Sequence, residues 1–271
     1  MVFHIGLHKT GTTFLQQNVF PNMEGVHTYV YYNPLWELFS SDEEAQTIVS
    51  CERLSGDPFR GAWADQGKTY VRNIARMFPE AKCIIGFRKH DALVRSLYKQ
   101  YLHSGWSASP DELFHPDGSG KISLEDLYFR DRIELCEQHF ADVLVYTQEE
   151  LRDNLNGFLR RLSQFLGTPL LTAKRIDQTK RNVGVRTQKQ VQLLRTLNRV
   201  NGGLKRIPGA PTLNNRLFRR FDITPRALCQ RRLTHHGKEP FTLPEATEAF
   251  LREEYAEDWA YVNTYRQQHV D

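Results

Sequence analysis

The sequence lacks long apolar runs, paired cysteine motifs, internal repeats and low-complexity tracts. None of its apolar stretches approaches the roughly 20 residues that a membrane-spanning helix requires, and its first residues lack the regions of a signal peptide. The four cysteines, Cys51, Cys83, Cys136 and Cys229, are scattered without a C-x-x-C pair, which disfavours a disulfide framework or a zinc site. We therefore expect a cytoplasmic protein with no transmembrane segment and no bound metal.

What the sequence does have is the composition of a folded protein. Its 271 residues are 40% hydrophobic, 11% aromatic and 25% charged, which excludes a disordered or fibrous chain. The length allows one large domain or two small ones. We expect a single domain over residues 1–271, with an α/β core in 1–170 and a mainly helical, basic part in 171–271.

The charge is strongly polarised along the chain. The formal net charge is only +4, but residues 174–232 contain 16 Lys and Arg residues against two acids. That segment carries +14 and the remainder −10, so it either presents a basic face to an anionic partner or forms helices with solvated basic side chains. Its basic residues alternate with Leu and Val rather than with exposed aromatic residues, which disfavours a nucleic-acid partner.

Strand-like and helix-like segments alternate along the first 170 residues. Runs with the composition of strands lie at 2–5, 26–32, 47–51, 83–87 and 142–146. Segments with helical spacing lie at 12–19, 66–78, 91–102 and 123–139, and later at 187–201 and from 242 onward. This alternation predicts an α/β fold with a central parallel sheet covered on both faces, and ligands at the carboxyl ends of its strands.

Residues 6–13, with the sequence GLHKTGTT, join the first strand to the first helix. Backbone N–H groups of such a glycine-bearing loop, together with the positive end of the helix, form a site for a phosphate or sulfate. Read against the pattern G-x-x-x-x-G-K-[ST], the loop has Thr12 in place of the lysine, and Lys9 lies inside the loop instead. His8 flanks Lys9.

The strand at 83–87 ends in Arg88, where a nucleotide-hydrolysing protein would have a magnesium-binding Asp. A small-molecule kinase or nucleotide-binding protein with a degenerate phosphate loop remains the alternative enzyme class, although it lacks both of these residues. A non-catalytic module that binds polyanions through residues 174–232 is a third hypothesis.

The loop resembles the 5′-phosphosulfate loop of the sulfotransferases that use 3′-phosphoadenosine 5′-phosphosulfate (PAPS), which Lys9 to Thr13 match residue for residue. A second match follows the fourth strand. That family has an Arg at the strand end and, eight positions later, a Ser that joins it on the 3′-phosphate of the cofactor; here these are Arg88 and Ser96. A guanidinium and a hydroxyl two helical turns apart can converge on one phosphate.

The resemblance is to bacterial, carbohydrate-type members and implies a P-loop-like three-layer α/β/α fold. It implies transfer of a sulfuryl group from PAPS to a hydroxyl or amine, with no metal. Lys9 would neutralise the leaving phosphate oxygen, and Ser96 would restrain Lys9 until the acceptor arrives. The cofactor-binding residues that it implies are Lys9, Thr10, Gly11, Thr12, Thr13, Arg88, Ser96, Tyr146, Arg181, Asn182 and Arg186. Tyr146 would lie near the adenine or, equally, serve as a core aromatic residue.

The acceptor hydroxyl must lose a proton, so a Glu or His should lie close to the sulfur. Glu52, directly after the third strand, is the leading candidate for this base. Glu37 and His27 near the second strand compete with it, and His103 is more remote.

The expected acceptor is a small molecule or a glycan, and our preference is an acidic glycan or glycolipid that uses the basic segment. Five aromatic residues are candidates for lining the acceptor pocket, and we expect at least half of them to lie in the core instead. These are Tyr29, Tyr31, Tyr32, Trp36 and Trp63. No oligomeric state is predicted.

Overall fold

The computed structural model describes residues 1–40, 45–176, 185–204, 229 and 239–268. They form two compact units. Of the described residues, the first unit holds 1–40, 45–93, 122–176 and 251–268, and the second holds 94–121, 185–204, 229 and 239–250. The second unit thus takes segments from both sides of residue 170, and a single domain over the whole chain stays a prediction.

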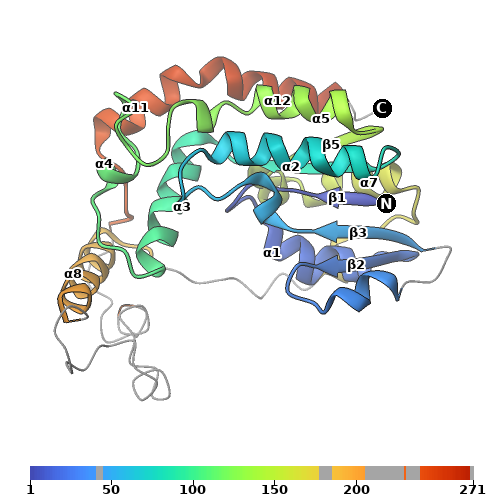
Figure 1. The fold of residues 1–271 in the computed structure, drawn as a ribbon, viewed down its shortest axis with the longest axis horizontal. Coiled ribbons are helices and arrows are strands. Elements are labelled where there is room, and N and C mark those ends of the chain that lie inside the picture. Colours follow the sequence, from blue (N-terminus) through green and yellow to red (C-terminus); the bar gives the residue numbers. More distant parts are fainter. Residues whose placement is uncertain (41–44, 177–184, 205–228, 230–238, 269–271) are drawn as a thin grey trace. The chain divides into compact units, whose positions relative to one another are not determined.

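The first unit is built around a five-stranded, all-parallel sheet in the order β2-β3-β1-β4-β5. Its strands are β1 Val2–His4, β2 Val26–Val30, β3 Gln46–Ser50, β4 Lys82–Phe87 and β5 Asp142–Thr147. The arrows of β2 and β3 run in the same direction in Figure 1. All five predicted strands are present within two residues of their expected ends, and the α/β class with a central parallel sheet is confirmed.

Helices connect the strands. The first unit contains α1 Thr12–Phe14, a π-helical continuation Leu15–Val19, α2 Trp63–Met77, α5 Arg130–His139, α6 Gln148–Asp153, α7 Leu155–Leu166 and α12 Ala256–Gln268. The second contains α4 Pro110–Leu113 and α8 Gln188–Leu204. Two further helices, α3 His90–His103 and α11 Glu245–Glu254, have residues in both units.

The continuous helix predicted over 123–139 is wrong. A 3-10 turn covers Glu125–Leu127, and α5 begins only at Arg130. The carboxylate of Asp258 on α12 accepts the backbone N–H groups of Phe129 and Arg130 at 2.9–3.1 Å, which places the start of α5 there. This contact joins residues far apart in the sequence, so local spacing could not reveal it.

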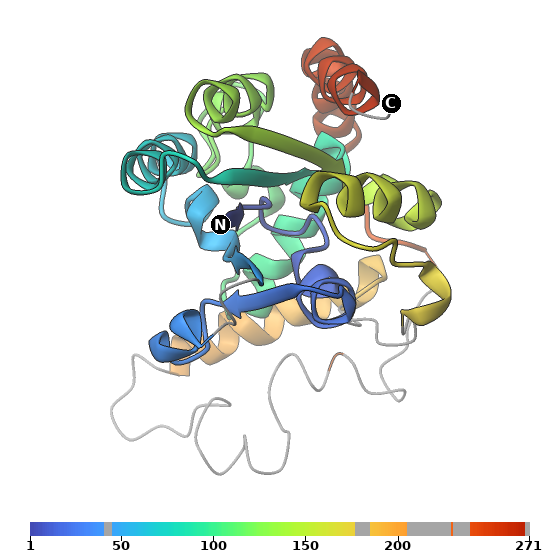
Figure 2. The same cartoon turned by 90° about the vertical axis from the view of Figure 1, so that its right-hand side faces the viewer.

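The two faces of the sheet pack against different helices, because successive strand residues point to opposite sides. On one face, Val2, Ile48, Ile84 and Leu144 join a buried cluster with residues of α7 and of the segment after α1. On the other face, the side chains that pack together come from β4, α2 and α5, and include Ile85, Val71, Leu135 and Cys136. Figure 2 shows α2 and α5 on one side of the strands and α1 and α7 on the other. Helices thus cover both faces, as predicted.

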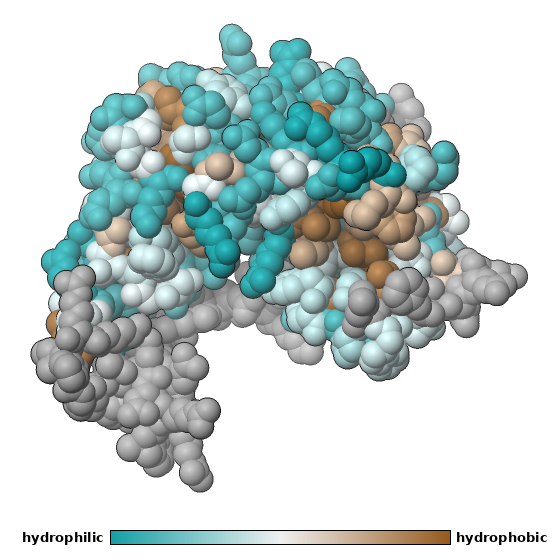
Figure 3. Space-filling model, in the orientation of Figure 1, coloured by the Kyte–Doolittle hydropathy of each residue, from teal (hydrophilic) through white to brown (hydrophobic). Residues whose placement is uncertain are grey.

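The loop after β1 lies at the point where the order of the strands reverses: the chain adds strands on one side of β1 first and on the other side afterwards. From β1 the chain runs to β2 on one side, and from β3 it crosses β1 to reach β4 on the other side. Ligands of parallel α/β sheets bind at such switch points, outside the carboxyl ends of the strands. On the face seen in Figure 3, apolar patches lie among hydrophilic residues, and the exposed apolar residues of the described chain include Met77 and Phe78 at the C-terminal end of α2. In the described residues, no helix is both long and apolar enough to cross a membrane.

Candidate functional site

The loop after β1 is shaped by backbone pairing and by two residues with positive φ. The N–H of Leu7 donates to the carbonyl of Gly86 on β4 at 3.1 Å, which extends the strand pairing into the loop. The Thr10 hydroxyl then donates to the Leu7 carbonyl at 2.6 Å. Lys9 (φ 70°) and Gly11 (φ 99°) adopt the left-handed region, which a lysine rarely does. Such strain is typical of functional sites.

The start of α1 has donors for an anion. No described side chain caps this helix, so its first N–H groups are not used by the helix or by a cap. The Thr12 hydroxyl oxygen is buried and makes no hydrogen bond of ordinary geometry among the described residues, although the Tyr146 phenol lies near it, whereas Thr13 is exposed. Backbone N–H groups, a buried hydroxyl and the positive helix end together fit a phosphate or sulfate group.

Arg88 follows β4 and reaches the same loop. Its half-buried guanidinium donates from Nη1 to the carbonyl oxygen of Lys9 at 3.2 Å. The structure therefore brings together the lysine loop and the strand-end arginine that the sequence singled out, at the carboxyl edge of β1 and β4.

A buried polar chain lies beneath the loop. His4 Nε2 is 2.9 Å from the Tyr146 hydroxyl, and His4 Nδ1 is 2.7 Å from the Ser50 hydroxyl. Gln16 Nε2 in turn donates to the Ser50 hydroxyl at 3.0 Å. Burial lowers the pKa of His4 to about 3, so the imidazole is neutral at neutral pH. A Cβ on Gly6 would lie 2.7 Å from the Tyr146 hydroxyl. The loop therefore packs directly on these buried polar groups, and they fix its position above the sheet.

Of the two roles that the sequence left open for Tyr146, its burial supports the core role, and a contact with the adenine stays a prediction. Its side chain is fully buried, and burial raises the pKa of its phenol. The ring lies so close to Gly86 that a Cβ there would collide with it. Tyr146 therefore supports the loop from below.

Glu52 opens the 3-10 turn Glu52–Ser55 after β3, beside the phosphate loop. The N–H of Cys51 donates to the His4 carbonyl at 3.0 Å and keeps this turn against β1. The Glu52 carboxylate is half-buried, and its Oε1 lies 3.6 Å from His8 Nδ1. The other nitrogen of His8, Nε2, is 3.1 Å from the Gly56 carbonyl. The turn that carries the candidate base is thus linked to the loop by the imidazole that the sequence analysis treated only as a flank.

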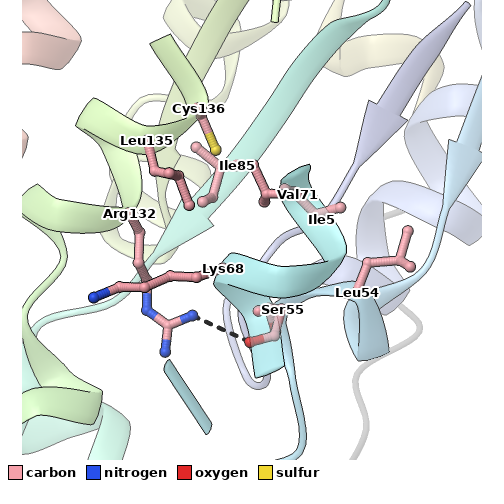
Figure 4. Close-up of a pocket in the computed structure, with 10 residues that line it drawn as sticks. Ile5, Leu54, Ser55, Lys68, Val71, Ile85, Arg132, Leu135 and Cys136 are labelled. Carbon is pink, nitrogen blue, oxygen red and sulfur yellow. Dashed lines mark hydrogen bonds between the residues drawn. The ribbon is translucent and has the colours of Figure 1, made fainter. Parts of the chain in front are cut away.

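Arg132 of α5 supports the same turn from the opposite side. It donates from Nη1 to the Ser55 carbonyl at 3.1 Å and from Nη2 to the Asp126 carbonyl at 3.2 Å, and its guanidinium lies 5.0 Å from the Trp63 ring centroid. Figure 4 shows it pointing toward Ser55 beside a cavity of about 10 Å³, the space of one water molecule. Burial lowers the pKa of Arg132 to about 10. No motif predicted this residue.

Of the two competing bases, His27 lies within β2 and Glu37 follows that strand, and the two residues contact each other. His27 Nε2 is 2.8 Å from the Glu37 carbonyl oxygen, and the Glu37 carboxylate accepts from Asn33 Nδ2 at 2.7 Å. Both side chains are half-buried. Because the Glu37 carboxylate is already engaged, Glu52 is the better placed of the acidic candidates.

The predicted acceptor aromatics divide into two groups. Tyr31, Tyr32 and Trp36 are 42–67% exposed, and the Arg53 guanidinium lies 5.2 Å from the Tyr31 ring centroid. Tyr29 is half-buried and donates to the Asn33 carbonyl. Trp63 is wholly buried at the start of α2, so it is a core residue and does not line a pocket.

The remaining predicted residues belong to the second unit or lie outside the description. Ser96 is half-buried on α3 and Arg186 is exposed before α8. His103 accepts a hydrogen bond from the Val185 N–H at 3.4 Å within the second unit. Arg181 and Asn182 lie outside the described residues, as does most of the basic segment 174–232. Their predicted roles stay predictions.

Taken together, the described site can bind an anionic group and accept a proton beside it. The part of the chain that the structure describes contains no cluster of three or more His, Cys, Asp or Glu residues arranged to hold a metal ion. Compared with known proteins, the sequence matches no family model and no curated protein. The function is therefore inferred from the geometry of this site and from the loop motif.

Proposed function

We propose that this protein transfers a sulfuryl group from PAPS to a hydroxyl or amine of an acceptor, and that the acceptor is a carbohydrate or glycolipid. One observation carries the proposal. The lysine-bearing loop after β1, Arg88 after β4 and Glu52 after β3 meet at the carboxyl edge of the sheet, and Arg88 donates directly to the Lys9 carbonyl. A P-loop-like fold would place its phosphate site at the same edge.

The residues that would hold the cofactor have matching chemistry. The N–H groups at the start of α1 and the buried Thr12 hydroxyl suit the 5′-phosphosulfate. Arg88 brings the planar, multiply donating charge that suits the 3′-phosphate. PAPS would supply the sulfuryl group and a phosphate as leaving group, and Lys9 lies in the loop where its ammonium would compensate the negative charge that develops there.

Glu52 is the proposed base. Its carboxylate is half-buried beside the loop, where it would take the proton that the acceptor hydroxyl loses. The reaction then requires mainly positioning and charge compensation. The kinase alternative gains no support from this site, since Thr12 replaces its lysine and Arg88 follows β4 where an acid is needed.

The surface after β2 supports a sugar acceptor. Val30 at the end of β2 pairs with Ser50 at the end of β3, so the exposed rings of Tyr31 and Trp36 follow a strand end next to the one that carries Glu52. Aromatic faces suit sugar rings, and the nearby Arg53 suits an anionic substituent. A cytoplasmic location and the absence of a metal stay predictions.

Calorimetric titration tests the cofactor. We expect 3′-phosphoadenosine 5′-phosphate (PAP) to bind the wild type without metal, and more tightly than ATP with magnesium. Lys9→Ala and Arg88→Ala should each weaken PAP binding by tenfold or more, because each loses a charge at the phosphate site. Arg152→Ala is the matched control, since Arg152 is exposed and paired with Asp153. Preference for magnesium-ATP, or no PAP binding, would contradict the proposal.

A further inference from the structure

His8 joins two segments that are distant in the sequence but adjacent at the site. It precedes Lys9 in the phosphate loop, and its side chain is only 15% exposed. One ring nitrogen contacts the Gly56 carbonyl and the other faces the Glu52 carboxylate. The imidazole therefore lies next to both Lys9, the residue proposed to compensate the leaving group, and Glu52, the proposed base.

The contact with Gly56 fixes which nitrogen carries hydrogen. A carbonyl oxygen only accepts, so Nε2 must donate to it. In the neutral ring Nδ1 is then the acceptor nitrogen, and it faces a carboxylate oxygen 3.6 Å away. Two acceptors that face each other gain a hydrogen bond as soon as one proton is placed between them. The pair is therefore arranged to hold one proton more than a neutral imidazole and a carboxylate carry.

The carbonyl that holds His8 is itself rigidly placed. Gly56 has φ 91°, and a Cβ there would collide with the Trp63 carbonyl. The preceding residue, Ser55, is held by Arg132. Since the Gly56 carbonyl is fixed from below, the imidazole plane and the direction of Nδ1 are fixed as well.

The surroundings of His8 oppose and favour its charge in known ways. Burial lowers the pKa of His8, the Glu52 carboxylate, the Gly56 carbonyl and Asp57 act to raise it, and Lys9 lowers it. The edge of the Trp63 ring also packs against the imidazole, with 6.4 Å between ring centroids. Glu52 is the strongest of the groups that favour the proton on His8.

We propose that His8 is the positioning partner of Glu52: it ties the Glu52 turn to the phosphate loop and shares, through Nδ1, the proton that Glu52 receives. The inference rests on the proposed function. As the acceptor O–H bond breaks, its proton passes to Glu52 and is hydrogen-bonded to His8 Nδ1. The acceptor oxygen forms its bond to sulfur, the bond between sulfur and the bridging phosphate oxygen breaks, and its electron pair stays on that oxygen.

Imidazole NMR of the full chain tests the pairing without any turnover. In the wild type we expect the neutral tautomer with hydrogen on Nε2. In Glu52→Gln the midpoint of the His8 titration should move to lower pH, because the negative charge that favours imidazolium is gone. The exposed His115, which pairs with Asp117, is the internal control and should not move. An unchanged His8 titration in Glu52→Gln, or hydrogen on Nδ1 in the neutral ring, would overturn the pairing.

Kinetics test the catalytic consequence. The His8→Gln side chain can still donate to the Gly56 carbonyl but cannot share a proton in the way an imidazole does. We expect the kcat of His8→Gln to fall about 10- to 100-fold. The acidic limb of its profile of kcat against pH should shift relative to wild type. Its affinity for PAP should stay within about twofold of wild type. His115→Gln should behave as wild type. A wild-type kcat and pH profile in His8→Gln would overturn the role.

The two arms separate this inference from the proposed function. If PAP fails to bind the wild type, the sulfotransferase proposal fails, and the role in sulfuryl transfer fails with it, while the NMR arm still decides the pairing of His8 with Glu52. If PAP binds and the His8 titration is the same in Glu52→Gln as in the wild type, only the inference about His8 fails.

Discussion

The two faces of the sheet support the site with different chemistry. On the α1 and α7 face, beneath the phosphate loop, lies a chain of neutral hydrogen-bonding groups from Gln16 through Ser50 and His4 to Tyr146. On the α2 and α5 face, beneath the Glu52 turn, a single buried cation, Arg132, donates to two backbone carbonyls.

The difference teaches that the two supports fail under different conditions. The stability that a neutral buried imidazole contributes is lost in acid, because protonation inside the core is costly. Burial lowers the pKa of the Arg132 guanidinium only to about 10, so it stays charged in acid and at neutral pH, and under those conditions only its removal frees the carbonyls that it satisfies. The loop side should therefore be sensitive to pH and the turn side to mutation.

The largest effect is expected from Arg132→Ala. It leaves two buried carbonyls unsatisfied and removes the packing against Trp63, so the free energy of unfolding should fall by about 4 kcal/mol. Urea denaturation measures the change. Arg72→Ala, at an exposed position of α2, should change it by no more than about 0.5 kcal/mol. If the two variants lost the same free energy of unfolding, Arg132 would not be a support of the Glu52 turn.

Acid should weaken the loop side next. The pKa of His4 is lowered from 6.5 to about 3 in the folded protein. Between these values the unfolded chain binds a proton that the folded chain does not, so stability falls as the pH drops. By pH 4.5 the loss from this group should reach about 3 kcal/mol. Urea unfolding at pH 7 and 4.5 measures it, and His4→Gln should show a smaller drop. Parallel pH dependences in the two proteins would contradict the assignment.

Tyr146→Phe should have a smaller effect on the same side. It removes the hydroxyl that partners His4 Nε2 and leaves that nitrogen buried without a partner, at a cost of about 2 kcal/mol. Chemical denaturation gives the value. Tyr70→Phe, on the exposed face of α2, is the matched control, and a neutral Tyr146→Phe would show that the chain beneath the loop is not energetically coupled.

The smallest expected effect is a gain. Ala62, at the start of α2, has φ 50°, and glycine adopts this region without strain. Ala62→Gly should stabilise the protein by about 0.5 kcal/mol and leave PAP affinity unchanged. Lys9→Gly relieves similar strain on the loop side but should abolish tight PAP binding. Thermal unfolding and titration of both variants make the comparison, and lost affinity in Ala62→Gly would contradict it.

The sequence predicted the strands and the loop well because their signals are local. The β-branched runs and the glycines of residues 6–13 identify themselves without knowledge of the fold. The start of the helix predicted over 123–139 could not be found in this way, since Asp258 places the start of α5 from a position about 130 residues away. The helix predicted from residue 242 onward is interrupted at Tyr255, between α11 and α12, and the Tyr255 hydroxyl donates to the distant Leu124 carbonyl.

The sequence indicated which residues of the candidate site follow strand ends, but not the residues that support them. Lys9, Arg88 and Glu52 each follow a strand, and parallel strands bring their carboxyl ends to one edge. Arg132 and His4 carry no motif, because a buried polar residue in a helix or strand has no local pattern that distinguishes it from an exposed one. His8 lay in view within the loop, but its link to Glu52 depends on how β3 pairs with β1.

Four of the ties that shape this site share one property: their acceptors are backbone carbonyls. They join Thr10 to Leu7, His8 to Gly56, Arg88 to Lys9 and Arg132 to Ser55. Every amino acid supplies a carbonyl oxygen, so the tie itself requires no particular side chain at the accepting position. Covariation between homologous sequences would therefore report the apolar core and stay silent about these ties, and the donor residues alone are the features to trace in a distant relative.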